Sequence, residues 1–359
     1  MIDRLRWSAP LNCSLNVTGR CNLECLHCSA SANPAYSTDM TTAQLREVIN
    51  ALDQAGICKV HVSGGEPLIR EDFFEIVSTF RERKIPITLF TNATLVSSEV
   101  VRRLVSEGNI LSISTSLDGS NPRSHDALRG DGTFDKAVKG IRLLVEAGFG
   151  VHATCIVSKL NMNELPQIAH VAKGLGIAIT FNPAVLVGRA RENKDVLELT
   201  KSEMDMIYDT VKSLAMQNGH VNGGTCLEWP RGKADFAKGI KSQTKPGGAL
   251  CICGICKESI SITPDGWVVP CNNFWEYEIG NMLTTDLREI WRSEKAQRIR
   301  ELHTHTSDEL DGCGDCLYTG MCGGGCRACA YASGKSLMGV DEFRCVKWYI
   351  EAEETAQCL

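Results

Sequence analysis

Three cysteines close to the N-terminus are spaced so that they can bind one metal cluster together. Cys21, Cys25 and Cys28 follow the pattern Cx3Cx2C within one short segment. Three thiolates on one loop can hold three irons of a [4Fe–4S] cube, and the missing fourth ligand leaves one iron open to a small molecule. Zinc is the alternative, but zinc usually takes four ligands and this segment supplies three.

A second group of cysteines lies near the C-terminus, where 11 of the 18 cysteines fall between Cys251 and Cys358. Cys256 and Cys271 flank Gly266, and a run with the spacing Cx2Cx5Cx3C follows. That run is Cys313, Cys316, Cys322 and Cys326, with Cys345 beyond it. A structural zinc site could use the four thiolates of the run, but it would leave the other three cysteines without a role.

The segments that must position the first cysteine group read alternately as strands and as helices. Short runs rich in Val, Ile and Thr predict strands at 11–17, 58–63, 85–91, 110–117, 150–157 and 177–183. Segments of helical period predict helices at 41–55, 71–83, 96–107, 133–147, 163–174 and 200–217, with hydroxyl N-caps at Thr41-Thr42 and Ser97-Ser98. Right-handed crossovers would curl such a parallel sheet into a barrel with its functional groups at the carboxyl ends of the strands.

The sequence thus predicts an α/β fold in which a partial (β/α)6 TIM-type barrel precedes a small Cys-rich α+β iron–sulfur domain. The predicted bounds are 1–217 for the barrel and 251–359 for the second domain. Between them, the glycine- and proline-containing stretch 218–250 is predicted to be a connecting segment with little regular structure.

Composition excludes several classes of function. The 359 residues carry a formal net charge of -5, and the basic residues form no stripe, which argues against nucleic acid as a partner. No signal peptide is apparent, and no apolar run reaches the roughly 18 residues that cross a bilayer. We therefore expect a cytoplasmic protein without a membrane segment. Disulfides are rare in that compartment, so clustered cysteines there favour metal binding.

The Cx3Cx2C segment after the first strand of a six-unit βα barrel resembles the signature of the radical S-adenosylmethionine (SAM) superfamily. The resemblance implies a [4Fe–4S] cluster on Cys21, Cys25 and Cys28, with SAM bound at its open iron. His27 departs from the pattern, because many members carry Tyr or Phe before the last cysteine. That position is not a ligand.

Further contacts to SAM are implied at the ends of later strands. The segment Ser63–Pro67 resembles the family's GGE motif, which places Gly64, Gly65 and Glu66 against the amino group of SAM. Weaker matches to the family add Asn92, Ser116 and Gly188 as contacts to SAM. Asn92 and Ser116 could instead be ordinary strand-to-helix caps, and Gly188 could be part of a glycine turn.

The C-terminal cysteines resemble the SPASM domain, an extension of radical SAM enzymes that carries two auxiliary [4Fe–4S] clusters, which brings the expected total to three. The resemblance places Cys251, Cys256, Cys271 and Cys326 on the first auxiliary cluster, and Cys313, Cys316, Cys322 and Cys345 on the second. Whether Cys251 or Cys253 is the ligand stays open. The remaining cysteines are interpreted mostly as core residues or surface thiols.

The resemblance implies an oxidoreductase that cleaves SAM reductively to a 5′-deoxyadenosyl radical and abstracts a substrate hydrogen, with the auxiliary clusters accepting an electron. The expected substrate is a ribosomal peptide, modified oxidatively. Because Cys21 leaves no room for a preceding leader-binding domain, a separate peptide-recognition protein is an expected partner, and flavodoxin or ferredoxin the expected electron donor.

A small molecule such as a cofactor, tetrapyrrole or antibiotic precursor is the alternative substrate, undergoing dehydrogenation or decarboxylation, because the segment 322–331 resembles the subgroup of cofactor maturases and heme-pathway decarboxylases. Sulfatase maturation is disfavoured, since those relatives carry Asp where this chain has Asn272. A non-catalytic electron-transfer or zinc protein is the distant alternative. No side chain is assigned as the catalytic acid or base.

Overall fold

The computed structural model describes residues 8–217, 219–224, 253–316, 324–334 and 336–341, together with Cys345. Within these residues the strands form one sheet in the order β10-β9-β8-β1-β2-β3-β4-β5-β6-β7. All pairs from β8 through β1 to β7 are parallel, whereas β9 runs antiparallel to β8 and β10. The strands are β1 (Asn12–Asn16), β2 (Lys59–Ser63), β3 (Ile87–Phe90), β4 (Ile110–Ser116), β5 (Val151–Val157), β6 (Ala178–Pro183), β7 (Val221–Gly223), β8 (Ser259–Ile262), β9 (Trp267–Val269) and β10 (Gly280–Asn281).

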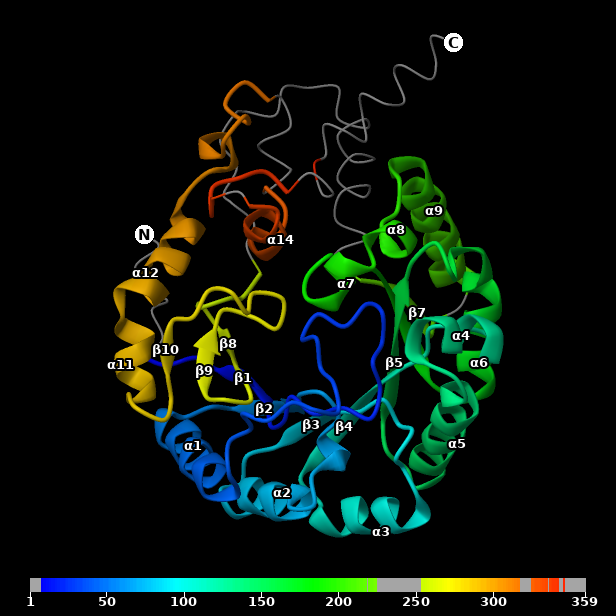
Figure 1. Ribbon diagram of the computed structural model, residues 1–359, viewed down its shortest axis with the longest axis horizontal. Helices are drawn as coiled ribbons and strands as arrows, with labels where there is room; N and C mark the ends of the chain where they lie inside the picture. Colours follow the sequence, from blue (N-terminus) through cyan, green and yellow to red (C-terminus); the bar gives the residue numbers. More distant parts are fainter. Residues whose placement is uncertain are drawn as a thin grey trace.

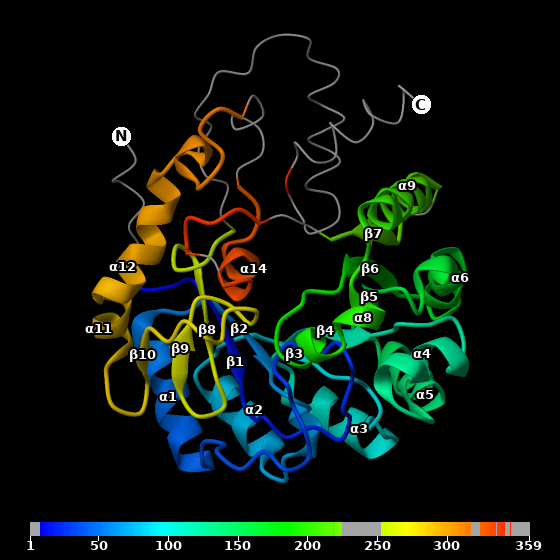
Figure 2. The ribbon, with the colours of Figure 1, turned by 45° about the horizontal axis from the view of Figure 1, so that its top comes forward.

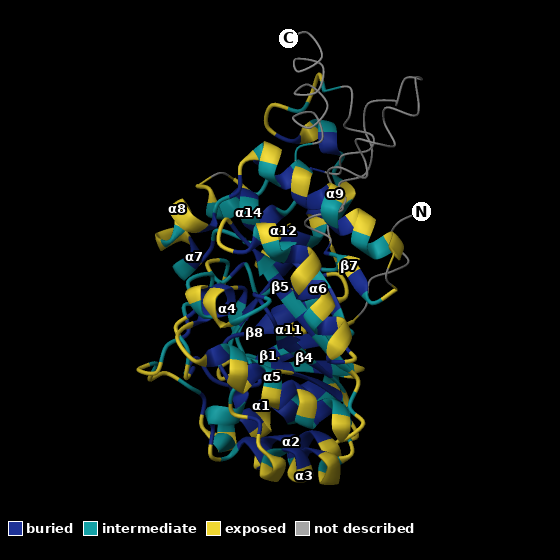
Figure 3. Ribbon diagram, turned by 90° about the vertical axis from the view of Figure 1, so that its right-hand side faces the viewer, coloured by how far each residue is buried: buried dark blue, intermediate teal, exposed yellow. Residues whose placement is uncertain are grey.

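Helices cover the outside of the curved sheet (Figure 1). The helices of the first two thirds of the chain are α1 (Thr42–Ala55), α2 (Phe73–Glu82), α3 (Ser98–Glu107), α4 (Pro122–Arg129), α5 (Thr133–Glu146), α6 (Leu165–Gly174), α7 (Arg189–Glu192), α8 (Lys194–Leu197) and α9 (Lys201–Gln217). Those of the last third are α11 (Leu287–Arg292), α12 (Glu294–Glu301) and α14 (Arg327–Ala332). Their inner faces are buried against the strands, and their outer faces are exposed (Figure 3).

The predicted elements are all present, with ends that differ by at most two residues from the expected ones. Both predicted caps form: Thr41 makes a capping box with Gln44 at the start of α1, and the Ser97 side chain accepts a hydrogen bond from the backbone N–H of Val100 in α3. Helix α4 was not predicted, because its polar sequence PRSHDALR has little apolar periodicity. Strand β7 was not predicted either, and it lies within the expected connecting segment 218–250.

The barrel is partial because β1 pairs with β8 on the side where a closed barrel would bring in the last strand. The three C-terminal strands therefore continue the sheet of the barrel. This confirms the predicted fold class. The exact domain bounds remain a prediction. Among the described residues, no helix has both the length and the apolar character that a membrane span requires.

Asn16, at the carboxyl end of β1, fastens the two parts of the sheet to each other. Its side-chain amide donates one hydrogen bond to the carbonyl oxygen of Ile262 in β8, at 2.8 Å, and one to Oδ1 of Asn272, at 3.1 Å. Asn16 is only 3% exposed, so water cannot replace these bonds. Asn272, which follows Cys271, is thereby hydrogen-bonded to β1, the strand that precedes the first cysteine group.

Replacing Asn16 by alanine is expected to lower the free energy of unfolding by about 1–3 kcal/mol, because the buried Ile262 carbonyl and the half-buried Asn272 side chain lose their donor. Amide hydrogen exchange measured by mass spectrometry should become faster in β8 and β9. Asn109→Ala is the control, because the Asn109 amide makes only one long hydrogen bond, 3.5 Å, to the carbonyl oxygen of Val77. If amide exchange in β8 and β9 is equally fast in Asn16→Ala and Asn109→Ala, the proposed role of Asn16 is contradicted.

Candidate active site

The cysteine-bearing loop connects β1 to α1, and we call residues 17–41 the cluster loop. Arg70 closes its base: Nη1 donates to the carbonyl oxygens of Val17, at 2.8 Å, and of Met40, at 3.1 Å. Arg70 is 7% exposed, and its other side pairs with Asp72 at 2.6 Å. The two ends of the loop are therefore held together by one buried guanidinium that follows the GGE segment in sequence.

The three predicted ligands of the first cluster come together. Cys21, Cys25 and Cys28 all line one cavity of about 530 Å³ at the carboxyl ends of the strands. Cys21 and Cys25 are buried, and burial raises the pKa of the Cys21 thiol to about 12. A bound metal would hold these sulfurs as thiolates, since it stabilises the charge that burial disfavours.

The two predicted glycines lie against the cluster loop. The backbone N–H of Gly65 donates to the carbonyl oxygen of Thr18 at 2.7 Å, and that of Glu66 to the carbonyl oxygen of Arg20 at 2.9 Å. A Cβ atom on Gly64 would lie 2.3 Å from the Thr18 oxygen, and one on Gly65 would lie 2.1 Å from the Arg20 oxygen. Only glycine allows this approach, which places both residues in the lining of the cavity.

Glu66 is fully buried beneath the cavity lining. Its carboxylate accepts hydrogen bonds from the N–H of Leu68 (3.1 Å), the hydroxyl of Thr91 (2.8 Å) and the N–H of Asn92 (2.7 Å). Burial raises the pKa of Glu66 to about 7, although the three hydrogen bonds act in the opposite direction. In this structure Glu66 ties the end of β2 to the end of β3, and its predicted contact with SAM stays a prediction.

Asn92 and Ser116 both line the cavity, as their predicted role requires. The Asn92 amide also donates to Oδ1 of Asn22, at 3.0 Å, within the cluster loop. Thr115, which was not predicted, lines the same cavity; its buried hydroxyl makes no hydrogen bond. A buried hydroxyl without a partner next to a cavity indicates space for a polar ligand.

Gly188 follows β6 and packs closely against the cluster loop. A Cβ atom on it would lie 2.3 Å from the carbonyl oxygen of Ser29, and its φ of +57° is one that glycine tolerates. The N–H of the next residue, Arg189, donates to the carbonyl oxygen of Cys28 at 3.0 Å. Gly188 thus packs against the cluster loop and lines a neighbouring cavity of about 190 Å³. A direct contact with SAM remains a prediction.

Helix α4 brings a group of buried residues to the cluster loop that sequence reasoning did not assign. Arg129 contacts Asp118, His27 and the sulfur of Cys25. Burial lowers the pKa of His27 to about 4, so its ring is neutral near pH 7. His27 lines the cavity, and its Nδ1 has no hydrogen-bond partner. The sequence did not predict that Arg129 lies next to Cys25, because 104 residues separate the two.

Four of the described C-terminal cysteines lie in one region of the structure. Burial raises the pKa of the Cys271 thiol, and charge on the neighbouring thiols of Cys326, Cys253 and Cys256 raises it further. Cys251 lies outside the described residues, and the choice between Cys251 and Cys253 stays open. Of the second predicted set, Cys313, Cys316 and Cys345 are half-buried, whereas Cys322 lies outside the described residues.

The site fits the expected cofactors on several grounds. The thiols of Cys21, Cys25 and Cys28 all line the cavity, and three thiolates can hold three irons of a [4Fe–4S] cube. The cavity of about 530 Å³ is of the size that holds a nucleoside-sized ligand, and it offers unpaired polar atoms on Thr115 and His27.

Comparison with known proteins agrees with this geometry. The family model described as Radical SAM superfamily matches residues 15–172, and that of the SPASM iron-sulfur cluster-binding domain matches residues 253–317. The AdoMet-dependent heme synthase of Methanosarcina barkeri is 32% identical over 337 residues, which cover 91% of this chain and 93% of that protein. The chain belongs to the radical SAM superfamily.

Two further proteins are similar to this radical SAM enzyme over most of its length. The mycofactocin maturase of Mycobacterium tuberculosis (strain CDC 1551 / Oshkosh) is 28% identical over 347 residues, which cover 96% of this chain and 84% of that protein. The crystal structure of Streptococcus suis SuiB bound to precursor peptide SuiA has a TM-score of 0.73 at 18% identity, covering 94% of this chain and 76% of that one. At that identity the likeness supports the fold alone.

The cofactors of this radical SAM enzyme are a [4Fe–4S] cluster with SAM, and further iron–sulfur clusters in the SPASM domain. Bound SAM supplies a radical that removes hydrogen from an unactivated C–H bond. Cys21, Cys25 and Cys28 are the residues that would hold the first cluster. The strand ends and the cluster loop line the cavity in which SAM would bind.

Changing Cys21, Cys25 and Cys28 together to alanine is expected to lower the iron content after anaerobic reconstitution from about 12 to about 8 atoms per chain, with loss of reductive SAM cleavage. Iron and sulfide assays measure the first effect, and formation of 5′-deoxyadenosine the second. Cys58→Ala is the control, because Cys58 is exposed and away from the cavity. A wild type with about 4 irons, or one that binds zinc, would refute the auxiliary-cluster assignment.

The raised pKa of Glu66 predicts a pH-dependent stability. Above about pH 4.5 the unfolded chain releases this proton, whereas the folded protein keeps it up to about pH 7. The unfolded state therefore binds fewer protons in this window, and stability falls as the pH rises. Relative to Glu66→Gln, the free energy of unfolding of the wild type should fall by about 2–3 kcal/mol between pH 5 and pH 8. Parallel pH profiles for the two proteins in denaturant titrations would contradict this.

Proposed function

We propose that this radical SAM enzyme oxidatively modifies a ribosomal peptide, whose reacting residue has an apolar side chain. The cavity of about 530 Å³, where SAM would bind, lies next to a small apolar cavity of about 60 Å³, and both are lined by Pro183 and Val185. A substrate in the small cavity would therefore lie next to SAM. The apolar cavity is the observation that carries the proposal.

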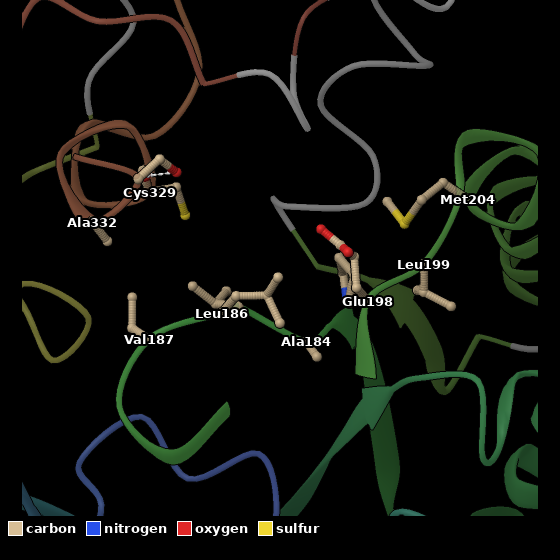
Figure 4. Close-up of a pocket in the computed structure, with 11 residues that line it drawn as sticks. Ala184, Leu186, Val187, Glu198, Leu199, Met204, Cys329 and Ala332 are labelled. Atoms are coloured by element: carbon tan, nitrogen blue, oxygen red, sulfur yellow. Dashed lines mark hydrogen bonds between the residues drawn. The ribbon is translucent and has the colours of Figure 1, made fainter. Parts of the chain in front are cut away.

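The walls of the small cavity come from two parts of the chain (Figure 4). Helix α14 supplies one side, and the loop after β6 together with the start of α9 supplies the rest. Figures 1 and 2 show α14 on one side of α7 and α9 on the other. The labelled lining residues are Ala184, Leu186, Val187, Glu198, Leu199, Met204, Cys329 and Ala332. A volume of about 60 Å³ gives room for one aliphatic side chain. Among the described residues that line this cavity, Glu198 is the one charged group; it pairs with Lys194 at 3.6 Å, and its carboxylate can also accept a hydrogen bond from an N–H donor.

The charges of the site favour a peptide over a tetrapyrrole. Heme precursors carry several carboxylates, which need basic partners. Among the described residues that line the three cavities, the basic side chains are His27 and Arg129. His27 is neutral near pH 7, and Arg129 is paired with Asp118. The small-molecule alternative is nevertheless favoured by one observation, the 32% identity to a heme synthase.

The rest of the proposal concerns electrons and partners. Two auxiliary [4Fe–4S] clusters would accept the electron left on the substrate, and the neighbouring thiols of Cys253, Cys256, Cys271 and Cys326 support the first of them. A flavodoxin or ferredoxin would supply the low-potential electron, and a separate recognition protein would deliver the leader part of the peptide. A cytoplasmic location suits the many cysteines.

The experiment compares two substrates with the reconstituted enzyme, SAM and a low-potential reductant. Short peptides encoded beside the gene are expected to lose hydrogen or carbon dioxide, detected by mass spectrometry together with 5′-deoxyadenosine. Leu186→Asp should lower peptide modification at least about tenfold, because a charge in the apolar cavity opposes binding. SAM cleavage without peptide should stay within about twofold, since that reaction does not use the small cavity.

The control variant is Leu111→Asp, because Leu111 is 60% exposed on β4 and lines none of the three cavities. It should leave peptide modification unchanged. Conversion of an iron porphyrin with carboxylate side chains, with no change in any peptide, would overturn the proposal in favour of the small-molecule alternative.

A further inference from the structure

The end of helix α4 is joined to the cluster loop through both backbone and side chain. The backbone N–H of Leu26 donates to the carbonyl oxygen of Leu128 at 2.9 Å. The next residue, Arg129, is 8% exposed, and its Nη1 lies 3.8 Å from the sulfur of Cys25. Its Nη2 lies 3.3 Å from Nε2 of His27. The guanidinium is thus directed at the ligand-bearing part of the loop.

Asp118 fixes the position of this guanidinium. Its Oδ2 accepts from Nε of Arg129 at 2.5 Å, and its Oδ1 accepts from the backbone N–H of Ile156 at 2.7 Å. The carbonyl oxygen of Asp118 accepts from the Asn161 amide at 2.8 Å. Because Asp118 is fully buried and held to β5, it leaves Arg129 little freedom to turn away from the cluster loop.

Both members of the pair are charged. A guanidinium stays protonated in proteins, so Arg129 carries a positive charge. Burial raises the pKa of Asp118, yet Arg129 lowers it below its usual range. The cation lies next to the sulfur of Cys25, and the anion lies behind the cation. Buried charges in this arrangement are screened little by water.

We propose that Arg129 is a positioning residue that hydrogen-bonds the Cys25 thiolate and raises the reduction potential of the SAM-binding cluster. Reduction adds one electron, and so one negative charge, to the cluster and its thiolates. A hydrogen bond and a positive charge at Cys25 stabilise that state, so they make reduction by a low-potential one-electron donor more favourable. Asp118 acts in the opposite sense, because its negative charge offsets part of the effect.

Arg189 provides a matched comparison on the same loop. Its Nη1 donates to the backbone carbonyl oxygen of Cys25 at 3.1 Å, and its Nη2 to that of Ala32 at 2.6 Å. Arg189 is half-buried and contacts carbonyl oxygens, whereas Arg129 contacts a sulfur. Removing Arg189 should loosen the cluster loop without removing a hydrogen bond to a ligand.

The test is an anaerobic redox titration of the reconstituted enzyme followed by electron paramagnetic resonance. The SAM-binding cluster is recognised by the change in its signal when SAM is added. In Arg129→Gln its reduction equilibrium constant should fall at least about tenfold, which is about 59 mV for one electron. In Asp118→Asn the potential should move in the opposite direction, whereas Arg129→Lys, which keeps the charge, should move it less than Arg129→Gln.

Two internal references separate this effect from loss of structure. The potentials of the auxiliary clusters should stay unchanged in every variant, and Arg189→Gln should shift the SAM-binding cluster by less than Arg129→Gln. An unchanged potential in a loaded Arg129→Gln enzyme, or an equal shift in Arg189→Gln, would overturn the proposal. If Arg129→Gln fails to load its cluster, the opposite shifts of Asp118→Asn and Arg129→Lys decide the question. Since no substrate is present, failure here leaves the peptide proposal untouched.

Discussion

The backbone hydrogen bonds between the cluster loop and the glycine turn after β2 are the contact on which the site depends. A loop without regular secondary structure has backbone polar groups that need partners when it is buried. Thr18 and Arg20 find them in the N–H groups of Gly65 and Glu66. Since β1 and β2 are paired in parallel register up to Asn16 and Ser63, the loop and the turn start side by side. The position of the cysteines thus follows from strand pairing.

The same first strand connects the site to the C-terminal part of the chain. β1 pairs with β2 on one edge and with β8 on the other, so the strand before the SAM cluster is also a neighbour of the segment between Cys256 and Cys271. An open sheet makes this possible, because a closed barrel would have no free edge for β8. The two groups of cysteines are therefore connected through a continuous piece of hydrogen-bonded sheet.

Buried charge gives the site its electrostatic character. Glu66 lies beneath the cavity lining and accepts hydrogen bonds from three donors, whereas Asp118 and Arg129 form a buried ion pair beside the cluster loop. Each of these groups would be costly to bury alone, and each is held by hydrogen bonds to strand ends. Rigid charges next to a water-poor cavity influence an electron on the cluster more strongly than they would in water.

The sequence predicted the parts of the site that depend on local order in the chain. Spacing within a few residues identified Cys21, Cys25 and Cys28, and strand periodicity placed them, with Gly64 and Gly65, at the carboxyl ends of neighbouring strands. The strand and helix order determined the fold class, because alternating βα units with right-handed crossovers leave few topologies.

Contacts between residues far apart in sequence were decided by tertiary structure alone. Arg129 meets Cys25 only because the polar helix α4 folds over the cluster loop, and β8 joins β1 across more than 240 residues. Gly188 is a further example. The sequence singled out this glycine, but it did not predict that Ser29 of the cluster loop packs against it. Periodicity and spacing report which face of an element is buried; which distant group covers that face depends on how the whole sheet curves and where it stays open.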